Sequence, residues 1–209
     1  MTGRIIRSAD DVAEGAAWLA AHVPQFSNLL PKIEPLPLRL KPDGFGALIH
    51  AIMGQQVSVA SANAIWERLQ AEGLTTGAAI AAVSHDDLRE LGLSRQKASY
   101  VHALAAADID YLALREAPTD HVLKTLIAVP GIGAWTAEVY AIFSLGRADV
   151  FAPGDLALQE GARMIFNLSE RPKDRELREM AKAWSPWRSV AARIIWAYYG
   201  ATKKRYGIL

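Results

Sequence analysis

The sequence has no cysteine, no long apolar run and almost no net charge. The absence of cysteine among 209 residues excludes disulfides, thiolate catalysis, cysteine-ligated zinc and iron–sulfur clusters. No apolar run approaches the roughly 20 residues that span a membrane, and the opening MTGRIIRSADDVAEGAAW lacks the apolar core of a signal peptide. A formal net charge of +1 does not by itself indicate a nucleic-acid partner. We therefore expect a soluble, cytoplasmic protein without a membrane partner.

Apolar residues at helical spacing are what the sequence does have. They make up 51% of the chain, enough to bury a core, and alternating runs of strand length are scarce. The proline-rich segment 31–42 is predicted to be an extended connector. The expected class is all-α. The predicted short helices cover about 8–21, 43–53, 58–72, 75–83, 85–91, 94–107, 109–114, 119–128, 134–145, 155–167, 174–183 and 186–199.

A glycine-containing break, VPGIG (residues 129–133, the hairpin), separates two of these helices. Proline disfavours αR in the residue before it, so the first helix ends there. Gly131 and Gly133 permit positive φ and close approach of another backbone. The N–H groups that open the second helix suit an anion such as a DNA phosphate. A plain turn without a ligand has the same pattern, so both interpretations stay open at this level.

An aspartate ends the segment VFAPGD (residues 150–155) and begins another predicted helix. Asp155 is therefore an N-cap candidate. The helix dipole and backbone N–H groups that make a good cap also hold a carboxylate in its ionised form, ready for chemistry. The local pattern does not choose between capping alone and a catalytic use.

Several separated motifs belong together. They are AIMGQQVSVASANAI (51–65), LGLSRQKASYV (91–101), VPGIGAWTAEVY (129–140) with VFAPGD (150–155), and WSPWRSVAARIIW (184–196). In this order they resemble the helix-hairpin-helix DNA glycosylase superfamily, and within it the 3-methyladenine DNA glycosylase II type. The resemblance implies two helical domains, residues 44–147 and residues 1–43 plus 148–209, with the active site in the cleft between them.

The resemblance makes Asp155 the catalytic residue. Loss of a base builds positive charge on the sugar, and a fixed carboxylate stabilises that state. An alkylated purine is already cationic and leaves as a neutral base, so the second carboxylic acid of ordinary glycosidases is not needed. The family's hairpin binds backbone phosphate, which implies contacts from Gly131, Ile132 and Gly133. Its carbonyl groups often hold a structural monovalent cation, and no catalytic metal or other cofactor is implied.

Trp135 and Trp196 match tryptophans of the family's base pocket, where aromatic faces suit a flipped cationic base. Trp196 lies opposite the main apolar stripe of its predicted helix, which fits either a pocket or packing between helices. Val139 replaces an aromatic residue of the best-known member and leaves the substrate range open. Bifunctional relatives such as endonuclease III carry a Schiff-base lysine at the position of Trp135, so no AP lyase activity is expected.

Two further groups of residues are candidate DNA contacts. The resemblance implies that Gln55 and Gln56 form a wedge that fills the gap left by the flipped base, with Gln56 at the wedge position. Ser94, Arg95 and Lys97 open another helix and are candidate phosphate contacts. An exposed polar loop and a solvated helix start are the structural alternatives.

We therefore predict a monofunctional base excision repair glycosylase for alkylated purines in double-stranded DNA, of the 3-methyladenine or 7-methylguanine type. We expect a monomer, located in the cytoplasm or, in a bacterium, on the nucleoid. One alternative is a monofunctional glycosylase for a neutral lesion such as uracil or an oxidised base. The other is a non-catalytic hairpin protein that senses damage, in which Asp155→Asn spares function.

Overall fold

The computed structural model describes residues 2–33 and 35–203. Within this part of the chain the regular structure is helical, apart from an isolated bridge between Ile5 and Arg147, so the predicted all-α class is confirmed. The chain divides into two compact units, Met1–Leu40 with Ala141–Leu209, and Lys41–Tyr140. None of the described helices is long and apolar enough to cross a membrane.

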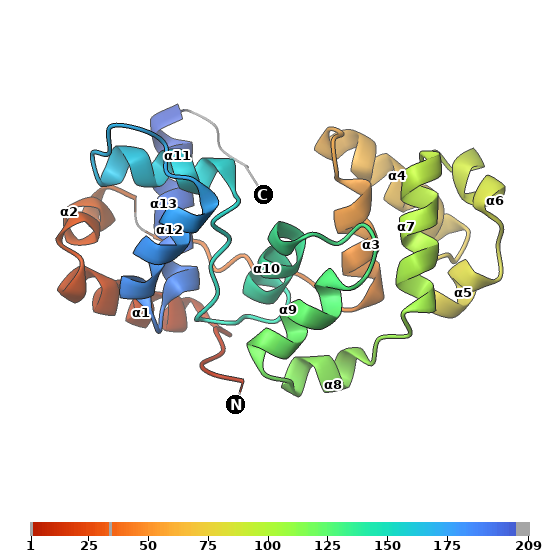
Figure 1. The fold of residues 1–209 in the computed structure, drawn as a ribbon, viewed down its shortest axis with the longest axis horizontal. Coiled ribbons are helices and arrows are strands. Elements are labelled where there is room, and N and C mark those ends of the chain that lie inside the picture. Colours follow the sequence, from red (N-terminus) through yellow and green to blue (C-terminus); the bar gives the residue numbers. More distant parts are fainter. Residues whose placement is uncertain (1, 34, 204–209) are drawn as a thin grey trace. The chain divides into compact units, whose positions relative to one another are not determined.

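The first unit is built around a C-terminal helix whose first half is buried. Figure 1 shows this helix among the other helices of the unit. Its elements are α1 (Ala9–His22), α2 (Pro24–Ile33), α11 (Leu156–Ile165), α12 (Asp174–Met180), the 3₁₀ helix η1 (Ala181–Trp184) and α13 (Arg188–Lys203). Helix α13 packs against α1, α2 and α11, and residues 189–196 are all buried. Gly161 permits the close approach of α11, because a Cβ there would lie 2.5 Å from Ile195 Cγ2.

The N-terminal segment runs beside the chain that leads to Asp155 in the same unit. The Ile6 N–H donates to the Gly146 carbonyl at 2.7 Å, and the Ala148 N–H donates to the Arg4 carbonyl at 3.0 Å. Gly146 has φ +66, and a Cβ there would lie 2.5 Å from the Ile6 carbonyl oxygen. Glycine is therefore required where the two segments meet.

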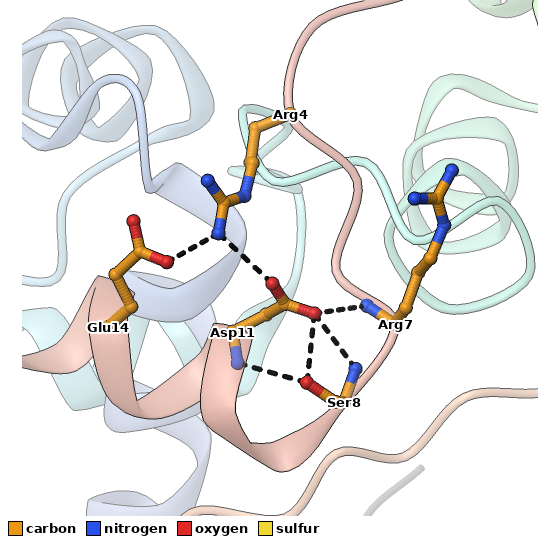
Figure 2. A network of polar contacts seen from close by, with 5 residues as sticks. All are labelled: Arg4, Arg7, Ser8, Asp11 and Glu14. Atoms are coloured by element: carbon orange, nitrogen blue, oxygen red, sulfur yellow. Dashed lines mark hydrogen bonds and ion pairs between the residues drawn. The ribbon is translucent and has the colours of Figure 1, made fainter.

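A polar network fastens this N-terminal segment to the start of α1 (Figure 2). Ser8 and Asp11 form a capping box, in which each side chain accepts the other residue's backbone N–H. Asp11 also accepts the Arg7 N–H at 2.9 Å and the Arg4 guanidinium at 3.1 Å, and Arg4 pairs with Glu14 as well. The Arg7 N–H, together with Ser8 and Arg4, lowers the pKa of Asp11 to about 2.

The second unit is a series of short helices (Figure 1). They are α3 (Phe45–Met53), α4 (Val59–Ala71), α5 (Gly77–Ala81), α6 (His85–Glu90), α7 (Arg95–Ala106), α8 (Tyr111–Glu116), α9 (Thr119–Ile127) and α10 (Ala134–Phe143), whose last three residues belong to the first unit. Side-chain N-caps explain why a new helix begins so often along this part of the chain. These caps are Ser58, Thr76, Ser84, Ser94 and Asp110.

The structure corrects two parts of the predicted helix pattern. The segment 31–42 is not extended from its start, because Pro31 lies inside α2 and costs that helix one hydrogen bond near its end. The last helix begins at Arg188 instead of residue 186, and it continues to Lys203. The hydroxyl of Ser185, the residue directly before the predicted start, donates to Asp149 Oδ2 at 2.8 Å.

Candidate active site

The Asp155 carboxylate is buried at the start of α11, with 8% of the residue exposed. Its Oδ1 accepts the N–H groups of Ala157 and Leu158, both at 2.9 Å. The same oxygen accepts the indole Nε1–H of Trp196 at 3.1 Å. The residue is thus an N-cap, as its local sequence predicts. The indole N–H is the third donor to Oδ1, and together these three hydrogen bonds orient the carboxylate.

A polar side chain one turn into α11 fixes the turn before Asp155. The Gln159 Nε2 donates to the Pro153 carbonyl at 2.8 Å, and the Asp155 N–H donates to the Ala152 carbonyl at 3.0 Å. Gln159 is itself buried. Sequence reasoning missed this residue, although a glutamine four positions after a predicted N-cap, among apolar residues, was a usable signal.

Trp196 is a buried residue of α13 and is 5% exposed. Its ring centroid lies 5.5 Å from the ring centroid of Phe143, and the Arg193 guanidinium carbon lies 5.0 Å from the same Phe143 centroid. Arg193 donates to the carbonyls of Ser189 at 3.0 Å and Leu38 at 3.1 Å, and burial lowers the pKa of Arg193 to about 10. The base-stacking role of Trp196 stays a prediction, but its contact with the Asp155 carboxylate was not foreseen.

The fold requires glycine at residue 131 of the hairpin but not at residue 133. Gly131 has φ +91, and a Cβ there would lie 2.4 Å from Tyr100 Cγ. Gly133 is outside the positive-φ region and has nothing within 4 Å of a Cβ position. Only Gly131 therefore uses the conformation that the sequence suggested for both. Ile132 between them is buried and donates its N–H to the Val129 carbonyl at 3.0 Å, and its predicted contact with a phosphate stays a prediction.

Trp135 lies in the first turn of α10, immediately after the hairpin, and is 37% exposed. Val139 follows one turn later on the same helix face and is half-buried. Both belong to the second unit, whereas Asp155 and Trp196 belong to the first. The assembly of these four residues into one pocket stays a prediction.

The wedge loop, residues 54–58, joins α3 to α4, and its two glutamines have different environments. The Gln55 Nε2 donates to the Gly131 carbonyl of the hairpin at 2.8 Å. Gln56 is exposed and has φ +58, which is uncommon for a residue other than glycine. Gln55 is thus held by the protein, and Gln56 is the glutamine that faces solvent. The exposed apolar neighbours of Gln56 are Val57 (42%) and Val59 (72%).

The three candidate phosphate contacts at the start of α7 also differ. The Ser94 hydroxyl caps the helix by accepting the Lys97 N–H at 3.2 Å. The Lys97 Nζ donates to the carbonyl of Met53, the last residue of α3, at 2.6 Å, and burial lowers the pKa of Lys97. Arg95 is exposed. Among the residues that the structure describes, no group of three or more His, Asp or Glu side chains is placed to hold a metal ion.

Comparison with known proteins defines the class. Residues 49–187 match the HhH-GPD superfamily of base excision DNA repair proteins, and the chain belongs to this family. Within the superfamily the chain is of the 3-methyladenine DNA glycosylase type, as its sequence predicts. The matched range includes the wedge loop, the hairpin and Asp155, and it ends before Trp196.

Individual relatives support this classification. The chain is 27% identical over 184 residues to the alkylbase DNA glycosidase-like protein mag2 of Schizosaccharomyces pombe, covering 82% of this chain and 86% of that relative. The crystal structure of a DNA-3-methyladenine glycosidase from Bacillus halodurans aligns with a TM-score of 0.78 and 31% identity, over 99% of this chain and 96% of that one. The fold is also that of the S. pombe 3-methyladenine DNA glycosylase in complex with abasic DNA, with a TM-score of 0.75 at 24% identity, over 91% and 97% of the two chains.

Proposed function

We propose that the protein is a monofunctional DNA glycosylase that hydrolyses the N-glycosidic bond of alkylated purines, of the 3-methyladenine or 7-methylguanine type. It binds duplex DNA at the damaged base and leaves an abasic site. The observation that carries the proposal is the Asp155 carboxylate, buried at a helix start with three donors on Oδ1. Relatives named as 3-methyladenine glycosylases support the substrate class.

In this mechanism the two oxygens of Asp155 have different tasks. Oδ1, held by three donors, sets the direction of the carboxylate. We assign Oδ2 to the sugar, where positive charge develops as the bond between C1′ and the base nitrogen breaks. The bonding electron pair leaves with the cationic base and neutralises it. Water then adds to C1′ and releases a proton to solvent.

The second unit supplies the proposed DNA contacts. The hairpin amides around Gly133 face a backbone phosphate, and the exposed ring of Trp135 stacks on the extruded base, with Val139 beside it. Gln56 enters the duplex at the gap that the base leaves. Arg95, which is exposed, is the residue at the start of α7 that we assign to phosphate.

Two further properties belong to the proposal. A tryptophan at residue 135 offers no amine for a Schiff base, so borohydride should trap no protein–DNA adduct. The hairpin carbonyls are hard oxygen ligands that suit a monovalent cation, which would add positive charge where the phosphate binds. We expect a monomer that acts wherever the DNA of its cell is located.

Release of free bases from methylated duplex DNA tests the function, with wild type measured beside Asp155→Asn. Asparagine keeps the shape and can still cap α11, but it lacks the charge, so we expect release to fall at least about 100-fold while binding to abasic-site DNA persists. Asp110→Asn is the matched control, because the Oδ1 of Asp110 also accepts two N–H groups of a helix start, from Leu112 and Ala113, both at 3.0 Å.

The possible outcomes separate the competing functions. Equal release by wild type and Asp155→Asn would remove this carboxylate from the chemistry. Release of uracil or an oxidised base, without methylpurine, would favour the neutral-lesion glycosylase. Salt-dependent DNA binding without release of any base would favour the damage sensor.

A further inference from the structure

We propose that Gln55 and Lys97 are positioning residues that hold the wedge loop against the hairpin, so that Gln56 is presented to the gap in the duplex. The inference rests on the proposed function, because it assumes that the protein extrudes a base. It adds that the wedge loop and the hairpin move together as one rigid unit. Neither Gln55 nor Lys97 needs to contact DNA to affect the reaction.

The first anchor joins the wedge loop to the hairpin across the second unit. The Gln55 Nε2 donates to the Gly131 carbonyl at 2.8 Å, and Gln55 is half-buried. That carbonyl is a fixed acceptor, because Gly131 is packed so closely on Tyr100 that a Cβ would lie 2.4–2.7 Å from three atoms of the tyrosine side chain. Movement of the hairpin is thus transmitted to the residue next to Gln56.

The second anchor holds the end of α3, from which the wedge loop departs. The Lys97 Nζ donates to the Met53 carbonyl at 2.6 Å, and a cation at a helix C-terminus is favourably placed in the field of the helix. Lys97 and Tyr100 are three residues apart on α7, so they share one face of that helix. The same face of α7 therefore supports α3 through Lys97 and the hairpin through Tyr100.

The backbone at Gln56 explains why anchoring is needed. A φ of +58 is unfavourable for a residue with a side chain and persists only when its surroundings hold it. The loop is fixed before Gln56 by the two anchors and after it by Ser58, whose hydroxyl accepts the Ser61 N–H at 3.2 Å. Without the Gln55 bond, the loop is expected to relax and to present Gln56 in several directions.

The first test uses Gln55→Met, which keeps the length of the side chain and removes the donor without adding charge. The probe is a duplex with a tetrahydrofuran abasic analogue opposite 2-aminopurine, whose fluorescence reports insertion beside the orphaned base. We expect affinity for this duplex to fall about fivefold to tenfold, the effect of one lost hydrogen bond. The control is Gln70→Met, an exposed glutamine of α4. Gln55→Glu, which places an acceptor against the Gly131 carbonyl, should weaken binding at least as much.

A double-mutant cycle distinguishes positioning from general damage to the loop. If Gln55 acts through Gln56, then Gln55→Met should have less than about a twofold effect in a Gln56→Ala background. Additive effects of the two changes would overturn the proposal. Melting temperatures of the single variants, equal to that of the wild type within a few degrees, establish that the fold is retained.

Lys97 has a separate readout, because a phosphate contact and a positioning contact differ in salt dependence. Loss of a phosphate contact reduces the slope of log affinity against log salt by about 1. We expect Lys97→Met to reduce affinity and the 2-aminopurine response with the slope unchanged, and Lys97→Arg to restore both. Lys182→Met, at an exposed lysine, is the matched control. A reduced slope would show that Lys97 contacts phosphate and would overturn its positioning role.

Failure of the positioning role can be distinguished from failure of the proposed function. If wild type releases methylpurine and Gln55→Met matches it in release and in binding, the positioning role fails and the function stands. If wild type releases no base, yet Gln55→Met weakens binding to the abasic duplex only when Gln56 is present, the function fails and the positioning role stands.

Discussion

Alanine substitutions at the two hairpin glycines should differ in their effect on stability, although the residues are separated only by Ile132. At Gly131 an added methyl group meets the Tyr100 ring at 2.4 Å, and the backbone has φ +91. At Gly133 the same methyl group meets nothing within 4 Å. The pair therefore isolates a role in the fold from a role in DNA binding.

The magnitudes follow from these contacts. A left-handed backbone costs an L-residue about 1–2 kcal/mol, and overpacking against a ring adds about 1–3 kcal/mol, so Gly131→Ala should destabilise by roughly 2–5 kcal/mol. For a chain of this size that lowers the melting temperature by roughly 4–20 °C. Gly133→Ala should be neutral or stabilise by up to about 1 kcal/mol, because alanine reduces the entropy of the unfolded chain.

Thermal melting and binding to an abasic-analogue duplex check the pair. We expect Gly133→Ala to melt like the wild type and to bind about tenfold more weakly, because its methyl group stands where we place the phosphate. Equal melting temperatures for the two variants would refute the packing argument for Gly131. Unchanged DNA binding by Gly133→Ala would refute the assignment of the phosphate to this turn.

Three further substitutions test other contacts. Gly161→Ala should destabilise by about 1–3 kcal/mol in urea unfolding and reduce base release, because its Cβ would lie 2.5 Å from Ile195 Cγ2 and move α11 away from α13. Asp11→Asn should lose about 1 kcal/mol at pH 7. Because the folded pKa of Asp11 is lowered to about 2 from 3.8, that difference is fully present above pH 3.8 and should disappear as pH falls to 2. Trp196→Phe should reduce the single-turnover rate of base release about tenfold or more, because Asp155 loses a donor.

Local signals explain why most helices could be predicted. Ser8 with Asp11, and Ser84 with Asp87, form the capping boxes whose spacing is visible in the sequence. Helix boundaries failed where local rules conflict with packing. Pro31 remains helical, and the chain before Arg188 forms a turn that the sequence pattern reads as a helix start.

Motifs in the sequence select the residues of the candidate site, but they do not predict the contacts that these residues make. Gln55 and Gly131 are 76 positions apart, and Lys97 and Met53 are 44 apart, so no periodic pattern links either pair. These contacts arise only when α3, α7 and the hairpin pack together. A motif can therefore single out the loop that contains Gln55 without showing that the Gln55 amide donates to the hairpin.

Trp196 is the residue for which sequence and structure point to different roles, and Trp196→Phe separates them. If the ring is a stacking surface, phenylalanine preserves an aromatic face, so the effect should fall on binding of the charged base and remain small. If the indole N–H orients Asp155, a hydrogen bond to a charged group worth about 1.5–3 kcal/mol is lost, which corresponds to roughly 10–150-fold in the rate at saturating enzyme. Trp18→Phe in the same unit is the control, because Trp18 stacks on His22 in α1. A normal saturated rate with weakened half-saturation would return Trp196 to the pocket wall and leave the two backbone N–H groups of α11 as the donors that orient the carboxylate.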